Sequence, residues 1–156
     1  MPAFAKTISF ACVAAAVAGL AFAQTTLDPV AAEAARSAHM KLYGAQMAVL
    51  GGMAQEKTPY DAVAAQTAAD TLVTLTMVDQ STWWPVGSDS DSIADSRALP
   101  LIWTSMDDVI VKAMALGDAA LVMQTAAGTD LASLQGAMGA VGGACGACHE
   151  LYRKPE

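Results

Sequence analysis

The feature that most constrains this chain is the run Cys145-Gly146-Ala147-Cys148-His149 near its carboxyl end. In a helix, at about 100° per residue, Cys148 lies roughly 60° to one side of Cys145 and His149 roughly 40° to the other. The two thiols can then each add to a haem vinyl group, while the imidazole on the same face reaches the iron. The motif predicts one haem c attached through Cys145 and Cys148, with His149 as an axial ligand.

Three other chemistries use a CxxC pair. A redox motif usually opens a helix after a strand, whereas this one lies in an alanine- and glycine-rich segment without a strand pattern. A closed zinc site needs four ligands, and outside the motif the chain after residue 23 offers only His39 as a further cysteine or histidine. A structural disulfide is the third alternative. The position of the motif favours haem attachment over all three.

The first residues have the pattern of an export signal. Lys6 precedes an apolar run over residues 8–20, and the small residues at 21–23 fit a cleavage site. We expect residues 1–23 to be a cleaved signal peptide and residues 24–156 to form one periplasmic domain. The apolar run is short for a membrane span, and no later segment is expected to approach one. The sequence thus predicts a soluble mature protein without stable membrane insertion.

The net charge argues against one class of partner, and the cysteine content indicates the cellular compartment. Removal of the signal discards Lys6 and leaves seven basic against 15 acidic side chains, a net charge of −8 with neutral histidines. Nucleic acid is therefore not an expected partner. The two cysteines that remain both belong to the motif, which agrees with an oxidising compartment.

Two helices are predicted before the middle of the chain. The first should span about 29–55, because Asp28 is a good cap and a proline follows it. The same order at Thr58 and Pro59 predicts a second helix that ends near Met77. Its expected packing residues are Val63, Leu72 and Leu75.

Residues 79–97 are rich in Ser, Asp, Gly and Pro, which predicts a long surface connection. Trp83 and Trp84 at its start are interpreted as a hydrophobic clasp over one end of the helices, with a binding platform as the alternative.

Two further helices are predicted after this connection. Apolar residues keep the helical period from Ile102 to Ala127, which predicts one long third helix that stops at Gly128. Thr129 should cap the fourth helix. One stripe of that helix carries Leu131, Leu134, Met138, Val141, Cys145 and Cys148.

Two arginines are interpreted as cations near the haem. Arg36 shares the inward face that we predict for Met40, which is unusual for a cation unless an anion such as a haem propionate lies beside it. A salt bridge to Glu33 is the alternative. Arg153 lies one turn beyond His149, where the helix dipole attracts a cation in any case.

The order of these motifs resembles the class II c-type cytochromes, the cytochrome c′ family, over essentially the whole chain after the signal. The matching residues are Arg36 and Met40, Pro59-Tyr60-Asp61, Ile102-Trp103, and Cys145-Gly-Ala-Cys148-His149-Glu-Leu-Tyr152-Arg153. The resemblance implies an all-α fold, an antiparallel four-helix bundle that encloses one covalently attached haem. It also implies that His149 is the proximal ligand and that Met40 faces the distal side of the iron.

The family divides at this distal position. In high-spin members a non-ligating apolar residue leaves the iron five-coordinate, and nitric oxide or carbon monoxide can bind. In the low-spin c-556 branch a methionine is the sixth ligand, and Met40 fits that branch, although some high-spin members also carry a methionine there. The resemblance therefore implies a one-electron carrier, with the gas-binding cytochrome as the alternative. An enzyme is not expected, because His39 is the only further histidine that could act as an acid or base, and the helical wheel places it about 100° from Met40. An electron carrier needs a redox partner protein, and the resemblance does not identify it. Many relatives form a homodimer through helices one and two, so the resemblance also implies this as an expected assembly.

Overall fold

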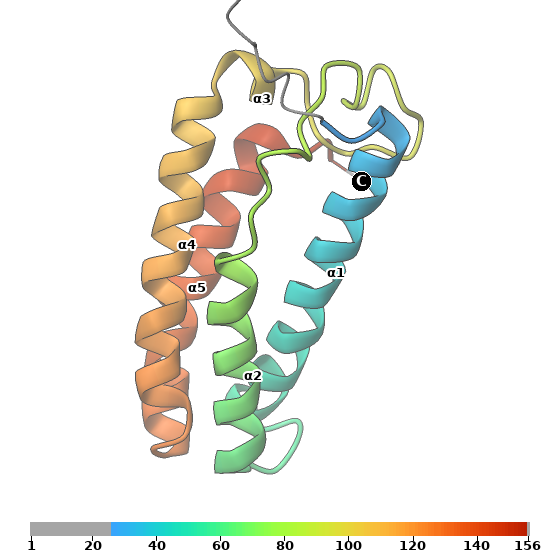
Figure 1. The fold of residues 1–156 in the computed structure, drawn as a ribbon. Coiled ribbons are helices and arrows are strands. Elements are labelled where there is room, and N and C mark those ends of the chain that lie inside the picture. Colours follow the sequence, from blue (N-terminus) through green and yellow to red (C-terminus); the bar gives the residue numbers. More distant parts are fainter. Residues whose placement is uncertain (1–25, 156) are drawn as a thin grey trace, which may run out of the picture.

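The computed structural model describes residues 26–155, and the predicted signal peptide lies outside them. The described helices are α1 (Pro29–Ala54), α2 (Ala62–Thr76), α3 (Leu101–Thr104), α4 (Met106–Ala127) and α5 (Leu131–Tyr152). Four of them form an antiparallel bundle, and α3 is a single turn at the upper end in Figure 1. The predicted all-α four-helix bundle is confirmed.

The caps account for where three of the helices begin. Asp28 accepts a hydrogen bond from the Val30 N–H at 3.0 Å, so α1 starts as predicted. The predicted start of the second helix at Pro59 is wrong, because Asp61 is the residue that caps α2. The predicted cap Thr129 is wrong by one residue. The carboxylate of Asp130 accepts the first-turn N–H of α5 at 2.7 Å.

The predicted continuous third helix is also wrong, because it breaks at Ser105. Ser105 has φ −134° and ψ 31°, which ends α3 and starts α4 in a new direction. The indole N–H of Trp103 donates to the Trp84 carbonyl at 3.1 Å and ties this short turn to the long connection over 77–100. Gly128 follows the last residue of α4, as predicted.

The connected cluster of buried apolar side chains lies in the lower half of the bundle, towards the end where α4 ends and α5 begins (Figure 1). Among the described residues, α4 buries none before Ala119, and after Val141 α5 buries only Tyr152. Because α2 ends at Thr76, the upper half consists of parts of α1, α4 and α5 with α3 and the irregular connection. The largest fully buried apolar side chains of the lower half are Leu50, Leu72, Met123, Leu134 and Val141.

The second helix packs through part of the expected face. Leu72 is 1% exposed and Leu75 is 7% exposed, which confirms both predictions. The prediction for Val63 is wrong, because this side chain in the first turn of α2 is 77% exposed.

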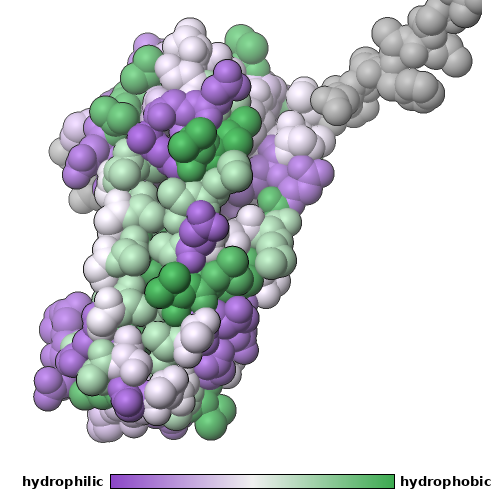
Figure 2. Space-filling model, turned by 90° about the vertical axis from the view of Figure 1, so that its left-hand side faces the viewer, coloured by the Kyte–Doolittle hydropathy of each residue, from purple (hydrophilic) through white to green (hydrophobic). Residues whose placement is uncertain are grey.

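The outer face of α4 is apolar. Five large side chains on it are about half exposed or more: Ile110, Val111, Met114, Leu121 and Val122. Figure 2 views this side and shows hydrophobic residues across its middle, with hydrophilic residues mainly at the two ends. Within the described chain, α4 alone is long and apolar enough to cross a membrane by length and composition. The expectation that no later segment approaches a span is therefore wrong, because α4 is apolar on its outer face as well as where it packs.

Candidate haem site

The CxxCH motif lies on the last turns of α5, above the core. Cys145, Cys148 and His149 are each partly buried, on the continuation of the stripe that carries Leu134 and Val141 deeper in the bundle. The common stripe expected from the sequence is therefore present. Burial is the main cause that raises the pKa of both thiols.

The imidazole of His149 is kept in its neutral form by its surroundings. Burial is the main cause that lowers its pKa, and the positive charges of Arg153 and Arg97 lower it further. A neutral imidazole is the form that can coordinate iron. Arg153 itself is exposed at the end of α5, where its backbone pairs with Ala98.

Helix α1 faces α5 in a definite antiparallel register. The side-chain amide of Gln135 donates to the Ala54 carbonyl at 2.8 Å, and a Cβ on Gly51 would lie 3.7 Å from Met138 Cε. The two residue numbers add to the same total in both pairs, as expected when two helices run antiparallel at a constant register. The register can therefore be followed upward from the lower half.

Met40 and His149 lie at the same level in this register. Met40 is eleven residues above Gly51 on α1, and His149 is eleven residues above Met138 on α5. Eleven residues raise each position by roughly 16 Å and turn it by only about 20°. Met40 therefore lies on the upward continuation of the face through which α1 meets α5 at Gly51 and Ala54, and Gly44 on the same face carries no side chain.

The predicted inward face of Met40 requires one qualification. Gly51 on this face is buried, whereas Met40 is 47% exposed. At this level α1 is covered on a different face, where the end of α2 and the connection that carries Trp83 bury His39 and Arg36. The neighbour of Met40, His39, is 4% exposed and points elsewhere, because its Nε2–H donates to the Leu75 carbonyl at 3.0 Å.

Arg36 is buried, but its partners differ from those expected. Its guanidinium donates to the Trp83 carbonyl and to both oxygens of Ser88, at 3.0 Å to Oγ and 2.6 Å to the carbonyl. Among the described hydrogen bonds of Arg36, none goes to Glu33. Burial is the main cause that lowers its pKa, although the charges of Glu33 and Asp89 oppose this effect.

The tryptophans cover this cation. The guanidinium carbon of Arg36 lies 4.8 Å from the ring centre of Trp84 and 5.8 Å from that of Trp103. Trp83 meets the His39 ring edge-on at 5.4 Å. The clasp interpretation is confirmed, and its partner on α1 is a buried arginine. No sequence pattern singled out Ser88, which lies in a segment with several other serines.

The residues of the upper half fit a large apolar group bound to two thiols. Both cysteines are on the inner stripe of α5. Among the described residues α4 buries no side chain before Ala119, and α5 buries none between Val141 and Tyr152, so the protein's own packing does not fill the space around the thiols. A four-helix bundle that carries CxxCH at this place defines a class of haem proteins, the c-type cytochromes of the bundle type.

Comparison with known proteins identifies the family. The family model described as Cytochrome C′ matches residues 31–153, so the chain belongs to the cytochrome c′ family of class II c-type cytochromes. Membership implies covalently attached haem c and an electron-carrying haemoprotein.

Individual relatives agree with this assignment. The chain is 45% identical to cytochrome c-554 of Cereibacter sphaeroides over 117 residues, 75% of this chain and 76% of the relative. It is 33% identical to cytochrome c-556 of Agrobacterium fabrum over 120 residues, 76% of this chain and 77% of the relative. The solved cytochrome c′ from Rhodobacter sphaeroides superposes with a TM-score of 0.80 at 34% identity, over 83% of this chain and 100% of that one.

Proposed function

We propose that this protein is a periplasmic one-electron carrier whose haem c is bound through Cys145 and Cys148 and ligated by His149 and Met40. The observation that carries the proposal is the register of α1 against α5. It brings Met40 to the level of His149, on the face of α1 that meets α5 lower in the bundle. These are the two sides from which axial ligands would approach one iron.

The neighbours of Met40 support the choice of ligand. His39 has the stronger intrinsic preference for iron, but it is buried and held by the carbonyl of Leu75. To reach the iron it would need to leave that bond and rotate α1 by about 100°. Gly44, one turn below Met40, has no atom outside its own helix within 4 Å of an added Cβ. This leaves room beside α1 for a large planar group.

Bound haem supplies a reversible one-electron change at iron, and a thioether as sixth ligand raises its reduction potential. The chain's own residues determine how that change is used. His149 would hold the iron in its neutral form, and Met40 would be the second protein ligand. With both ligands supplied by the protein, the site would suit outer-sphere electron transfer rather than binding of a substrate.

The two arginines contribute positive charge near this level. In the α1–α5 register Arg36 is level with Arg153, four residues above Met40 and His149 respectively. We propose that both stabilise haem propionates. Arg36 is buried under the tryptophan clasp, whereas Arg153 is exposed to solvent. The charge of Arg36 is therefore less screened than that of Arg153.

The test is the visible spectrum of the oxidised protein together with Met40→Ala. We expect a low-spin ferric spectrum for the unchanged protein and a high-spin spectrum for Met40→Ala. Met47→Ala is the matched control, because Met47 lies on the same helix two turns below. A high-spin spectrum in the unchanged protein, or no effect of Met40→Ala, would overturn the axial assignment.

The second candidate is a five-coordinate cytochrome that binds nitric oxide or carbon monoxide. It is favoured by the 47% exposure of Met40, which leaves its side chain free to swing away from the iron. A solved variant of cytochrome c prime from Alcaligenes xylosoxidans, 27% identical to this chain with a TM-score of 0.71, is described with bound NO. Rapid binding of carbon monoxide to the reduced, unchanged protein would favour this candidate.

Location and assembly are part of the proposal. Export by residues 1–23 would bring the chain to the periplasm, where haem attachment and redox partners are available.

A homodimer through α1 and α2 is consistent with a solved relative described by its ligand-controlled dimer dissociation. Leu42 and Val49 on α1 are 52% and 39% exposed and offer apolar contacts. Leu42→Glu should produce a monomer in sedimentation if this pairing occurs, whereas a monomeric unchanged protein would exclude it.

A further inference from the structure

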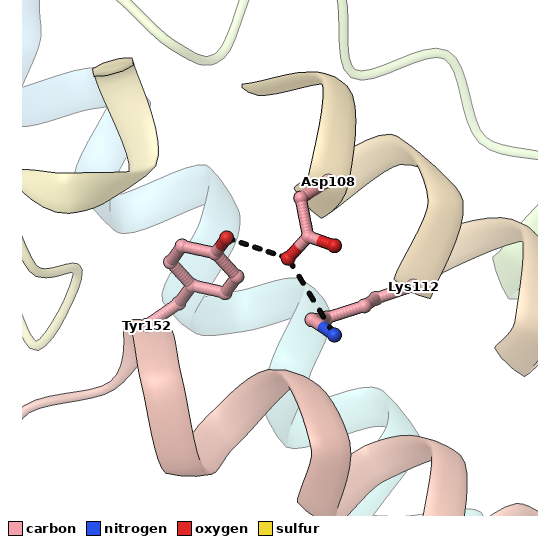
Figure 3. Close-up of polar contacts among 3 residues, drawn as sticks. All are labelled: Asp108, Lys112 and Tyr152. Atoms are coloured by element: carbon pink, nitrogen blue, oxygen red, sulfur yellow. Dashed lines mark hydrogen bonds and ion pairs between the residues drawn. The ribbon is translucent and has the colours of Figure 1, made fainter. Parts of the chain in front are cut away.

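A cluster of three polar residues joins the start of α4 to the end of α5, and two of them, Asp108 and Lys112, were not predicted from the sequence. The Tyr152 hydroxyl donates to Asp108 Oδ2 at 2.6 Å, and Lys112 Nζ lies 3.5 Å from the same oxygen. Figure 3 shows both contacts converging on Asp108 from the two helices. Tyr152 is 5% exposed and is the last buried residue of α5.

This cluster lies beside the haem attachment residues. Tyr152 is three residues after His149 and four after Cys148, so it lies on the same side of α5 about one turn higher. Because α4 and α5 run antiparallel, the Asp108–Tyr152 contact brings Lys112, four residues further along α4, level with Cys148. The charges of Lys112 and Asp108 both act on the Cys148 thiol, which agrees with this register.

We propose that Asp108, held by Tyr152 and Lys112, is a positioning residue that fixes the haem-bearing end of α5 against α4 and sets the reduction potential of the haem. The proposal rests on haem attachment at Cys148 but does not depend on ligation by Met40. The upper half has few buried contacts, so a short bond to a buried tyrosine constrains the end of α5 more than it would in the lower half.

The charges of Asp108 and Lys112 predict the direction in which each residue shifts the midpoint potential. Reduction adds an electron to the haem, so a nearby carboxylate disfavours the reduced form and a nearby ammonium favours it. The hydrogen bond from Tyr152, and then the charge of Lys112, lower the pKa of Asp108, which keeps it ionised at neutral pH. Asp108 should therefore lower the midpoint potential and Lys112 should raise it.

The experiment is a redox titration of the exported holoprotein and its variants. We expect Asp108→Asn to raise the midpoint potential and Lys112→Gln to lower it. Asp107→Asn is the matched control for net charge, since Asp107 is the next residue on α4, is exposed like Asp108, and is not part of the cluster. It should give a smaller rise than Asp108→Asn. Shifts of the same sign for Asp108→Asn and Lys112→Gln, or equal shifts for Asp107→Asn and Asp108→Asn, would overturn the electrostatic role.

A thermal double-mutant cycle on the exported holoprotein tests the positioning role by a measurement that is independent of the midpoint potential. Tyr152→Phe and Asp108→Ala should each lower the melting temperature by several degrees. The double variant should melt no lower than the less stable of the two single variants. Additive losses in melting temperature would overturn the positioning role of the bond between Asp108 and Tyr152. If the electron-carrier proposal failed instead, the unchanged protein would show a high-spin spectrum, while the opposite shifts in the two charge variants would remain.

Discussion

The two halves of the bundle are built differently. In the lower half, four helices bury a continuous set of apolar side chains, among them Leu72, Met123 and Leu134 at 0–1% exposure. In the upper half, α2 is absent, and the buried residues of α1 include the polar pair Arg36 and His39. The difference indicates that the lower half is stabilised by its own side chains, whereas the upper half depends on the tryptophan clasp, the Asp108 cluster and the cofactor that its cysteines bind.

The largest expected effect comes from removing the attachment residues. Cys145→Ala/Cys148→Ala should carry no covalent haem, because both thioether bonds are lost. The upper half would then lack the group that its apolar side chains pack against, so the melting temperature should fall strongly. Acid–acetone extraction checks the attachment: it should leave the unchanged protein coloured and the variant colourless. Colour lost from the unchanged protein, or an undiminished melting temperature in the variant, would contradict the comparison.

The lower half should respond to cavity formation with or without haem. Leu134→Ala removes a fully buried side chain and should cost about 2–5 kcal/mol of unfolding free energy. Leu121→Ala is the control, because Leu121 is 48% exposed on the outer face of α4 and should cost much less. Urea unfolding of both variants measures the difference. Equal losses would mean that the outer face of α4 is covered in solution.

The clasp should respond to loss of its cation. Arg36→Gln removes hydrogen bonds from a charged donor to the Trp83 and Ser88 carbonyls, which should cost about 1.5–3 kcal/mol. If Arg36 also stabilises a propionate, the midpoint potential should fall, because a nearby positive charge favours the reduced haem. Lys41→Gln removes an exposed charge from the same helix and serves as the control. A loss of stability with an unchanged potential would limit Arg36 to the clasp.

The smallest effect concerns Tyr43, near the boundary between the halves. Burial is the main cause that raises its pKa to about 12. Because the folded value is above the ordinary value of about 10, its stabilisation is present below pH 10 and is lost as the pH rises toward 12. Tyr43→Phe should therefore lose less stability than the unchanged protein between these values. Parallel alkaline unfolding curves would show that Tyr43 ionises freely in the folded protein. Tyr60→Phe provides a comparison at a partly buried tyrosine of the lower half.

The sequence predicted the helices more reliably than the places where they break. Asp28 fixed the start of α1 correctly, since a cap depends on bonds within three residues. Thr58 has the same kind of side chain for capping, but Asp61, three residues later, is the residue that caps α2. The break at Ser105 had no local signal. It accompanies the bond between Trp103 and the Trp84 carbonyl, a contact across 19 residues that no periodic pattern reveals.

The sequence by itself determined the chemistry of the cofactor, because CxxCH needs only one turn of helix to bring two thiols and an imidazole to one face. It also pointed to Met40, through the helical spacing that puts Met40 on the inward face and through a family resemblance. Only the tertiary structure decided that Met40 and His149 are level, since that depends on how α1 slides against α5 and is fixed by contacts such as Ala54 with Gln135. Helical spacing is local and can be computed from the residue numbers. The register between helices is set by side chains far apart in the chain, and it appears only when they pack.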